Sequence, residues 1–147
     1  MAADRAVVVE RLADLDLEPS RPVIYDRPIA LRQLLRDPRT GAEHYLIRYP
    51  VGLRAQWHRH TAAHTIVVLE GRLVVNGRVI GPGSYCHLPA GEPMHHAPAD
   101  GESCLFVIVF DGPFDVEPVP ETGGTTAEHP RAPSGPQRDA PDSHRCR

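Results

Sequence analysis

The chain has 147 residues, a formal net charge of −3 and 41% hydrophobic residues. This length suffices for one folded domain with a hydrophobic core, and the charge leaves no basic surface of the kind that nucleic-acid binding requires. The three cysteines, Cys86, Cys104 and Cys146, have unrelated spacings, which argues against a disulfide framework and indicates a reducing compartment.

Residues 1–22 predict a short helical extension. Apolar residues recur at helical spacing in VVVERLADLDL (residues 7–17), and Pro19 ends any helix that contains them. Charged residues interrupt the apolar run at the N-terminus, so it resembles neither the core of a signal peptide nor a membrane-spanning helix. We therefore expect a cytoplasmic protein with no membrane partner.

From residue 23 to 117 the pattern changes to short apolar runs separated by turn residues. Asp-Pro followed by Gly at 37–41 predicts one hairpin, and Asn76-Gly77 between two apolar stretches predicts another. Many short strands with little helix predict an all-β sandwich or barrel. The run 105–110 is apolar throughout, so we expect the barrel interior on one face and the N-terminal helix or a second subunit on the other.

Residues 118–147 have a different composition. This stretch is rich in Pro, Gly, Thr, Ser and Arg, and it cannot bury enough apolar surface to offset the entropy lost on ordering. We predict a flexible Pro-rich tail. The chain then divides into an N-terminal extension (1–22), a barrel (23–117) and this tail.

Histidines gather in the middle of the chain. The stretch WHRHTAAH contains His58, His60 and His64. Because side chains alternate along a strand, His58 and His60 point the same way and can reach one metal ion together. The stretch PMHHAP supplies His95 and His96 as further candidates. Neutral imidazole is the commonest metal-ligating side chain, so the cluster predicts a metal site.

Two glycine-flanked stretches resemble the motifs of the cupin superfamily. The pattern G-x5-H-x-H-x3-H-x6-G, from Gly52 to Gly71, resembles the first motif. The pattern G-x5-P-x-G, from Gly83 to Gly91 and followed by histidine, resembles the second. The resemblance covers residues 23–112, and its joint spacing is more specific than one H-x-H. It implies a double-stranded β-helix, a jelly-roll barrel, with one divalent metal ion inside.

Two departures from the family pattern narrow this resemblance. The family usually has glutamate at the position of His64, so the chain resembles the small cupins with a four-histidine centre, which include manganese and iron proteins. The second motif usually has its histidine three residues after the glycine, whereas His95 follows Gly91 by four and His96 by five. We prefer His96, which requires a bulge before it, because HAP resembles the way other cupins leave this strand; His95 is the alternative. The resemblance thus implies four ligands: His58, His60, His64 and His96.

Such a centre has a defined chemistry. Four neutral imidazoles leave the charge of a divalent ion uncompensated, so the centre attracts an anionic chelator. An octahedral ion with four histidines keeps two adjacent positions for substrate or dioxygen. Iron or manganese, which we prefer, suits oxygen chemistry, whereas zinc or nickel suits non-redox polarisation. The sequence indicates no organic cofactor, and it does not identify the catalytic residues.

Three functions agree with this reading. We rank first a metal-dependent, dioxygenase-type oxidoreductase, a homodimer that acts on a small diketone, enolate or phenolate. The second is a non-redox cupin similar to the small polyketide cyclases. The third is a ligand sensor without catalysis, because LRQLLRDPRTG, HRHT and HAP also resemble the cupin half of zinc anti-sigma factors. We rank the sensor last because no sigma-binding helical domain fits before residue 23.

Overall fold

The computed structural model describes residues 5–120 of the chain. Within this range the secondary structure is almost entirely β, with one 3-10 turn, η1 (Leu12–Asp14). The strands are β1 (Glu18–Ser20), β2 (Ile29–Arg36), β3 (Glu43–Tyr49), β4 (His58–Arg59), β5 (His64–Glu70), β6 (Leu73–Val75), β7 (Arg78–Ile80), β8 (Tyr85–Leu88), β9 (His96–Pro98), β10 (Cys104–Phe110) and β11 (Glu117–Pro118). No helix in this part of the chain has the length and apolar character that a membrane crossing requires.

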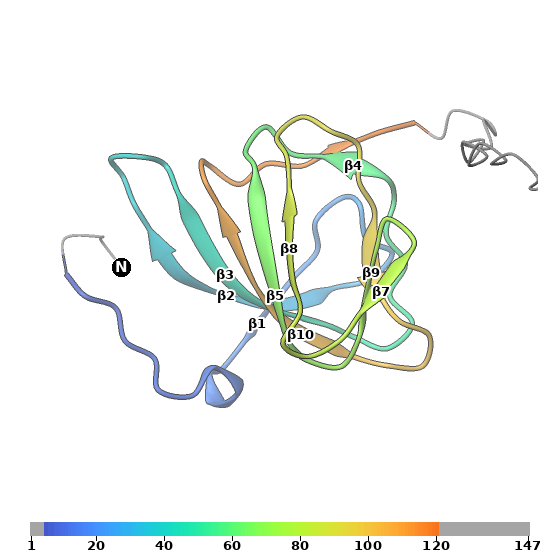
Figure 1. The fold of residues 1–147 in the computed structure, drawn as a ribbon, viewed down its shortest axis with the longest axis horizontal. Coiled ribbons are helices and arrows are strands. Elements are labelled where there is room, and N and C mark those ends of the chain that lie inside the picture. The colour runs from blue at the N-terminus through green and yellow to red at the C-terminus, as the bar shows by residue number, and fades with distance from the viewer. Residues whose placement is uncertain (1–4, 121–147) are drawn as a thin grey trace, which may run out of the picture.

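The strands form a barrel with one large and two small sheets. A six-stranded antiparallel sheet has the order β1-β2-β3-β10-β5-β8. The smaller sheets are β7-β6-β9 and β11-β4. Figure 1 shows β7 and β9 on the opposite side of the molecule from β2 and β3. Strand β10 lies between β3 and β5, and such non-consecutive neighbours are typical of a jelly roll. The predicted all-β jelly-roll barrel is confirmed.

Both predicted hairpins are present. Asn76 and Gly77 join β6 to β7 with φ angles of 48° and 81°, the left-handed pair that a type I′ turn requires. Asp37 and Gly41 close the connection between β2 and β3, because the amide of Gly41 donates to the carbonyl of Asp37 at 2.7 Å. Local turn residues therefore fix the register of two strand pairs.

Gly71, the closing glycine of the first motif, permits a close approach of two strands. Its φ angle is 69°. A side chain there would place its Cβ 1.9 Å from the carbonyl oxygen of Ser103, so only glycine fits. Gly71 directly follows β5 and Ser103 directly precedes β10. The glycine therefore fixes the far end of the strand that begins with His64.

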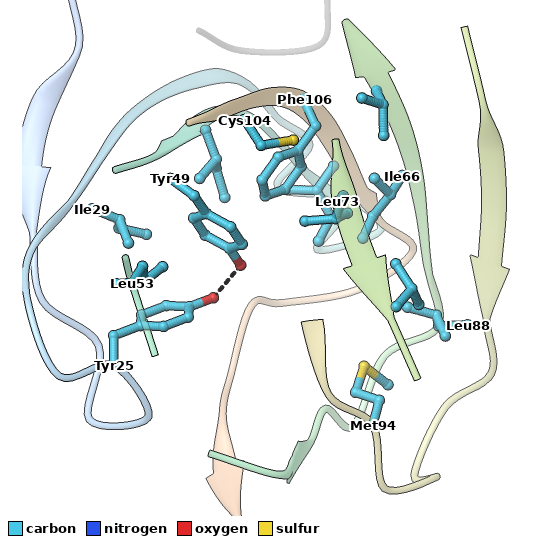
Figure 2. Packing of buried hydrophobic residues seen from close by; sticks show 14 of the residues in the cluster. Tyr25, Ile29, Tyr49, Leu53, Ile66, Leu73, Leu88, Met94, Cys104 and Phe106 are labelled. Atoms are coloured by element: carbon cyan, nitrogen blue, oxygen red, sulfur yellow. Dashed lines mark hydrogen bonds between the residues drawn. The ribbon is translucent and has the colours of Figure 1, made fainter. Parts of the chain in front are cut away.

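The barrel interior is apolar over most of its length. Side chains alternate along β5, where His64 and Ile66 are buried and the residue between them is partly exposed. Figure 2 shows Tyr49, Leu73 and Phe106 around the same interior, although they come from three different strands. His64 is therefore the first residue of a strand whose other inward-pointing residues are aliphatic.

Strand β10 is buried on both of its faces over only part of its length. Leu105 and Phe106 are adjacent and each at most 1% exposed, so both faces are covered at this point. Val107 and Val109, further along the strand, are partly exposed. Both faces are therefore covered at the start of the strand, and a cover by the N-terminal helix or a second subunit stays a prediction.

The N-terminal helix is shorter than the apolar spacing predicts. Instead of a helix over residues 7–17, only η1 forms, and its N-cap Arg11 makes no side-chain capping hydrogen bond. A segment this short gains too few internal hydrogen bonds to extend the helix. Apolar side chains from this segment share a surface groove with residues of β2: Val7, Val9, Leu12, Leu34 and Leu35.

The structure has a short strand at or near each of the two boundaries that we predicted between the extension, the barrel and the tail. Glu18–Ser20 form β1 and pair with β2, so the large sheet begins inside the stretch 1–22 that we assigned to the extension. Glu117–Pro118 form β11 and pair with β4 at the start of the predicted tail. Residues 121–147 lie outside the described residues, so the flexible tail stays a prediction.

Candidate metal centre

Four histidines meet inside the barrel. His58 begins β4, His60 directly follows it, His64 begins β5 and His96 begins β9. Each side chain is at most 3% exposed. The fold therefore brings together, from three strands, all four residues that the sequence suggests as ligands.

Nitrogen atoms of three of these rings form a compact group. His58, His60 and His96 each offer one ring nitrogen, and these atoms lie within 4.8 Å of one another. The Nε2 atoms of His58 and His96 are 3.2 Å apart. Ligand atoms about 2.0–2.1 Å from one ion lie roughly 3 to 4 Å from one another, and the distance between the Nε2 atoms of His58 and His96 falls in this range.

The other nitrogens of His58 and His60 are held by main-chain carbonyl groups. The Nδ1 of His58 donates to the carbonyl oxygen of Gln56 at 2.8 Å, and the Nδ1 of His60 donates to that of Asp115. A carbonyl oxygen only accepts, so each ring carries its proton on Nδ1. The lone pair of each Nε2 is thereby free for an ion, as in most histidine metal sites.

His96 is oriented by a tyrosine instead. Its Nδ1 lies 2.7 Å from the hydroxyl oxygen of Tyr49, and the two rings stack at 5.9 Å between centroids. Tyr49 lies on β3 and is completely buried. The Nε2 of His96 therefore faces His58, in the compact group.

Several buried ring nitrogens of these histidines have no hydrogen-bond partner among the described residues. These are the Nε2 of His60 and both ring nitrogens of His64. An unpaired buried polar atom costs about 1–3 kcal/mol and is rare in folded proteins. A bound cation would satisfy the Nε2 of His60 and the unprotonated nitrogen of His64, so the residues present fit a metal ion.

His64 lies beside the compact group rather than within it. Its ring centroid is 4.7 Å from that of His60 and 6.4 Å from that of His96. The three-nitrogen group does not include His64, so a fourth histidine ligand stays a prediction. Its two unpaired nitrogens are the observation in favour of that role.

All four rings are uncharged at neutral pH. Burial, the main cause, lowers the pKa of His58 to about 4 and that of His64 to about 3. Burial likewise lowers the pKa of His60, and it holds the pKa of His96 well below its ordinary value. Nearby histidines add to the effect on His96 and His64. Neutral imidazole is the form that binds a metal ion.

A carboxylate fixes the segment that supports His60. The side chain of Asp115 accepts hydrogen bonds from the amide of Thr61 at 2.8 Å and from its hydroxyl at 2.7 Å. Burial raises the pKa of Asp115, but the bonds from Thr61 outweigh it and the pKa is lowered. The segment after β10 is thereby held against the turn that follows His60.

His95 points away from the cluster. Its Nε2 lies 3.1 Å from the carbonyl oxygen of Ala55, and its ring lies against Trp57 at 5.7 Å between centroids. Met94, the residue before it, is 1% exposed and takes the inward position. Since side chains alternate in extended chain, His96 is the next residue to point inward. The structure therefore places His96, and not His95, among the clustered rings.

A cavity of about 240 Å³ lies beside His60 and His96. Its lining is mostly aliphatic and aromatic, with Ser20, Tyr25, Tyr45 and Tyr49 as the other polar residues: Ser20, Pro22, Ile24, Tyr25, Ile29, Leu31, Tyr45, Ile47, Tyr49, His60, His96, Ile108, Phe110, Phe114 and Val116. Among the described residues that line it there is no Asp, Glu, Lys or Arg. A small, largely apolar molecule with a few polar atoms fits this space.

Sequence reasoning missed the groups that orient the histidines. Gln56 and Asp115 act through main-chain carbonyl oxygens, which any residue type provides, so no sequence signal could identify them. Tyr25 and Tyr49 are distant from the motifs and are brought to the site by the fold. Their positions within apolar segments gave no sign of a polar role.

Residues 11–137 match the model of a family described as a domain of unknown function, DUF4437. The chain belongs to this family. The match contains all four clustered histidines. No curated protein matches the chain at a significant level.

The fold of this DUF4437 protein is similar to that of several solved structures. A cupin-like protein from Thermotoga maritima has a TM-score of 0.64 and 16% identity, over 71% of this chain and 86% of that one. An acetylacetone dioxygenase from Acinetobacter johnsonii has a TM-score of 0.65 and 19% identity, over 85% and 84%. The polyketide cyclase RemF from Streptomyces resistomycificus has a TM-score of 0.61 and 24% identity, over 78% and 86%. The DUF4437 chain thus has the cupin fold, as its motifs predict.

Proposed function

We propose that this DUF4437 protein is a cupin enzyme that depends on one divalent metal ion. The observation that carries the proposal is the compact group of buried ring nitrogens of His58, His60 and His96. These residues would hold the ion, with His64 as the fourth ligand. When bound, the ion supplies Lewis-acid polarisation of a chelating substrate and, if it is iron or manganese, a place for dioxygen to react.

We further propose that the enzyme is an oxygenase rather than a cyclase or isomerase. Reactions that move protons between carbon atoms need a base within reach of the substrate. No carboxylate or lysine is among the described residues that line the cavity, and its two histidines, His60 and His96, are proposed ligands of the ion. Burial raises the pKa of Tyr25 and of Tyr49, so both phenols stay protonated at neutral pH and neither provides a phenolate base. An oxygenase whose substrate is already an enolate or phenolate has no need of such a base.

The cavity also favours a small anionic chelator as substrate. No arginine or lysine is among the described residues that line it, so the charge of an anion would be balanced by an ion with neutral ligands. A cavity volume of about 240 Å³ is below the roughly 300–1,000 Å³ typical of sites for drug-sized ligands. Diketone enolates and simple phenolates have the required charge and size.

Metal analysis and oxygen uptake test the proposed function. Protein purified without added metal should contain about one equivalent of iron or manganese. Addition of acetylacetone without oxygen should give a new charge-transfer absorption, and admission of oxygen should bleach it with matching oxygen uptake. Conversion that proceeds equally well under argon would favour the cyclase or isomerase function instead. Protein that binds no divalent ion would overturn the proposal.

We also propose, from the sequence, a cytoplasmic homodimer. The outer surface of the large sheet is partly exposed at Val107 and Val109, where a second subunit would reduce the exposed apolar surface. Sedimentation of the purified full-length chain measures the oligomeric state directly. A monomer at micromolar concentration would contradict the dimer without affecting the proposed chemistry.

A further inference from the structure

Two buried tyrosines continue the hydrogen bonding of His96 along the cavity. The hydroxyl of Tyr49 bonds to the Nδ1 of His96 on one side and to the hydroxyl of Tyr25 on the other. Figure 2 shows the two phenol groups pointing at each other across the interior. Both tyrosines line the cavity, and Tyr25 is 8% exposed. Tyr25 is therefore the end of a chain of three polar groups.

The direction of these bonds follows from the protons. If the Nε2 of His96 faces an ion, its Nδ1 carries the proton and donates to the oxygen of Tyr49. The proton of Tyr49 then has one acceptor among the described residues, the oxygen of Tyr25. His96, Tyr49 and Tyr25 together carry three such protons, but only two hydrogen bonds join them. The hydroxyl proton of Tyr25 is left without an acceptor in the described part of the protein.

Tyr25 is held in place by its own main chain. Its amide donates to the carbonyl of Pro22 at 3.1 Å, and the carbonyl of Ile24 accepts from the amide of Gln56 at 2.8 Å. The carbonyl of Gln56 is the group that orients His58. The position of Tyr25 is thereby linked through Gln56 to that of a candidate ligand, so its hydroxyl is preorganised.

The position of Tyr25 at the end of this series of hydrogen bonds bears on which part of a ligand it can contact. Two successive hydrogen bonds separate it from the Nδ1 of His96, and that atom is on the side of the ring away from Nε2. The hydroxyl of Tyr25 is therefore not bonded to a candidate metal ligand, although it lines the same cavity. Its natural partner is a polar atom of the bound molecule other than those that chelate the ion.

We propose, on the basis of the proposed function, that Tyr25 is a specificity-determining residue that donates a hydrogen bond to an additional oxygen of the substrate. The substrate class is a small 1,3-dicarbonyl that carries a further carbonyl oxygen beyond the two that chelate the metal. A ligand without this oxygen leaves the hydroxyl of Tyr25 unpaired, which is the usual origin of discrimination by a buried polar group.

Two matched probes and one substitution test the proposal. Heptane-2,4,6-trione and heptane-2,4-dione have the same chain length and differ in the third carbonyl. Titration of the metal-loaded protein without oxygen gives the dissociation constant of each probe. The Tyr25→Phe protein should bind the trione about 3- to 10-fold more weakly than wild type and should bind the dione no more weakly than wild type does. Its metal content should be unchanged, because the bond between Tyr49 and His96 remains.

A control variant and the alternative outcomes separate the two proposals. Tyr85 on β8 is 68% exposed, and Tyr85→Phe should leave both dissociation constants unchanged. Equal affinity of Tyr25→Phe and wild type for the trione, or an equal loss for both probes, would overturn the role of Tyr25 and leave the metal site intact. Retained metal and dione binding in Tyr25→Phe report that the variant is folded. A wild-type protein that binds neither metal nor probe would overturn the proposed function itself.

Discussion

The two motif segments position their histidines by different means. In the first segment (58–64) two histidines share one side because they are two residues apart in extended chain. In the second segment (91–96) the inward position of His96 depends on contacts with the first. The amide of Gly91 donates to the carbonyl of one first-segment histidine, and Met94 pairs with another. The first segment is thus defined by local pattern, and the second by tertiary hydrogen bonds.

The largest effect should come from the first segment. His58→Ala or His60→Ala removes one of the three grouped nitrogens from a strand that cannot be re-aimed, so metal affinity should fall by more than about 100-fold. Metal analysis after dialysis against a weak chelator measures the loss. Full occupancy in His58→Ala would contradict the assigned site.

The second segment offers a comparison between two adjacent residues. His96→Ala should also weaken metal binding by about 100-fold, whereas His95→Ala should leave metal content unchanged, because His95 faces Ala55 and Trp57. The same dialysis measures both variants. The reverse result would mean that the bulge lies elsewhere and that His95 is the ligand.

His64 decides between three and four histidine ligands. If it binds the ion, His64→Ala should weaken metal affinity by about 10- to 100-fold, less than loss of a grouped ring. If it only fills space beside Phe110, the variant should retain its metal. His64→Gln, which keeps a polar side chain of similar reach, is the matched comparison for stability.

The smallest expected effect is the loss of stability of the metal-free protein as the pH is lowered. The folded-state pKa values of His58 and His64 are about 4 and about 3, below the ordinary value near 6.5. Below pH 6.5 the unfolded chain therefore binds more protons than the folded protein does. The free energy of unfolding decreases as the pH is lowered, until these rings are protonated in the folded state too. From pH 7 to 5.5 the free energy of unfolding should fall by about 1 kcal/mol for each ring. Denaturant unfolding measures it, and His64→Ala should remove only the share of the dependence that its own ring contributes, about 1 kcal/mol.

The contrast between the segments also explains what the sequence could predict. The hairpin at Asn76-Gly77, the close approach at Gly71 and the cluster of the first motif all follow from residues near one another in the chain. The short helix over 7–17 was predicted too long, because apolar spacing does not report a missing N-cap. Local patterns were reliable where backbone conformation is decided locally.

The rest of the site depends on distant parts of the chain. Tyr49 comes from β3 and Tyr25 from the segment before β2, and neither lies in a motif. The carbonyl group of Asp115 that orients His60 belongs to the main chain, so any residue type could provide it. The carboxylate that binds Thr61 does require an acidic residue at this position. Only the fold shows that the group of three nitrogens leaves His64 at its side.

The bond from His60 to the main chain of Asp115 has a consequence for the minimum length of a working protein. A chain shortened after residue 112 would keep every candidate ligand, yet it would lack the acceptor that orients His60 and the β11 strand that pairs with β4. A chain shortened after residue 120 would keep both. The functional unit therefore extends beyond the last histidine of the site by more than twenty residues, as far as β11.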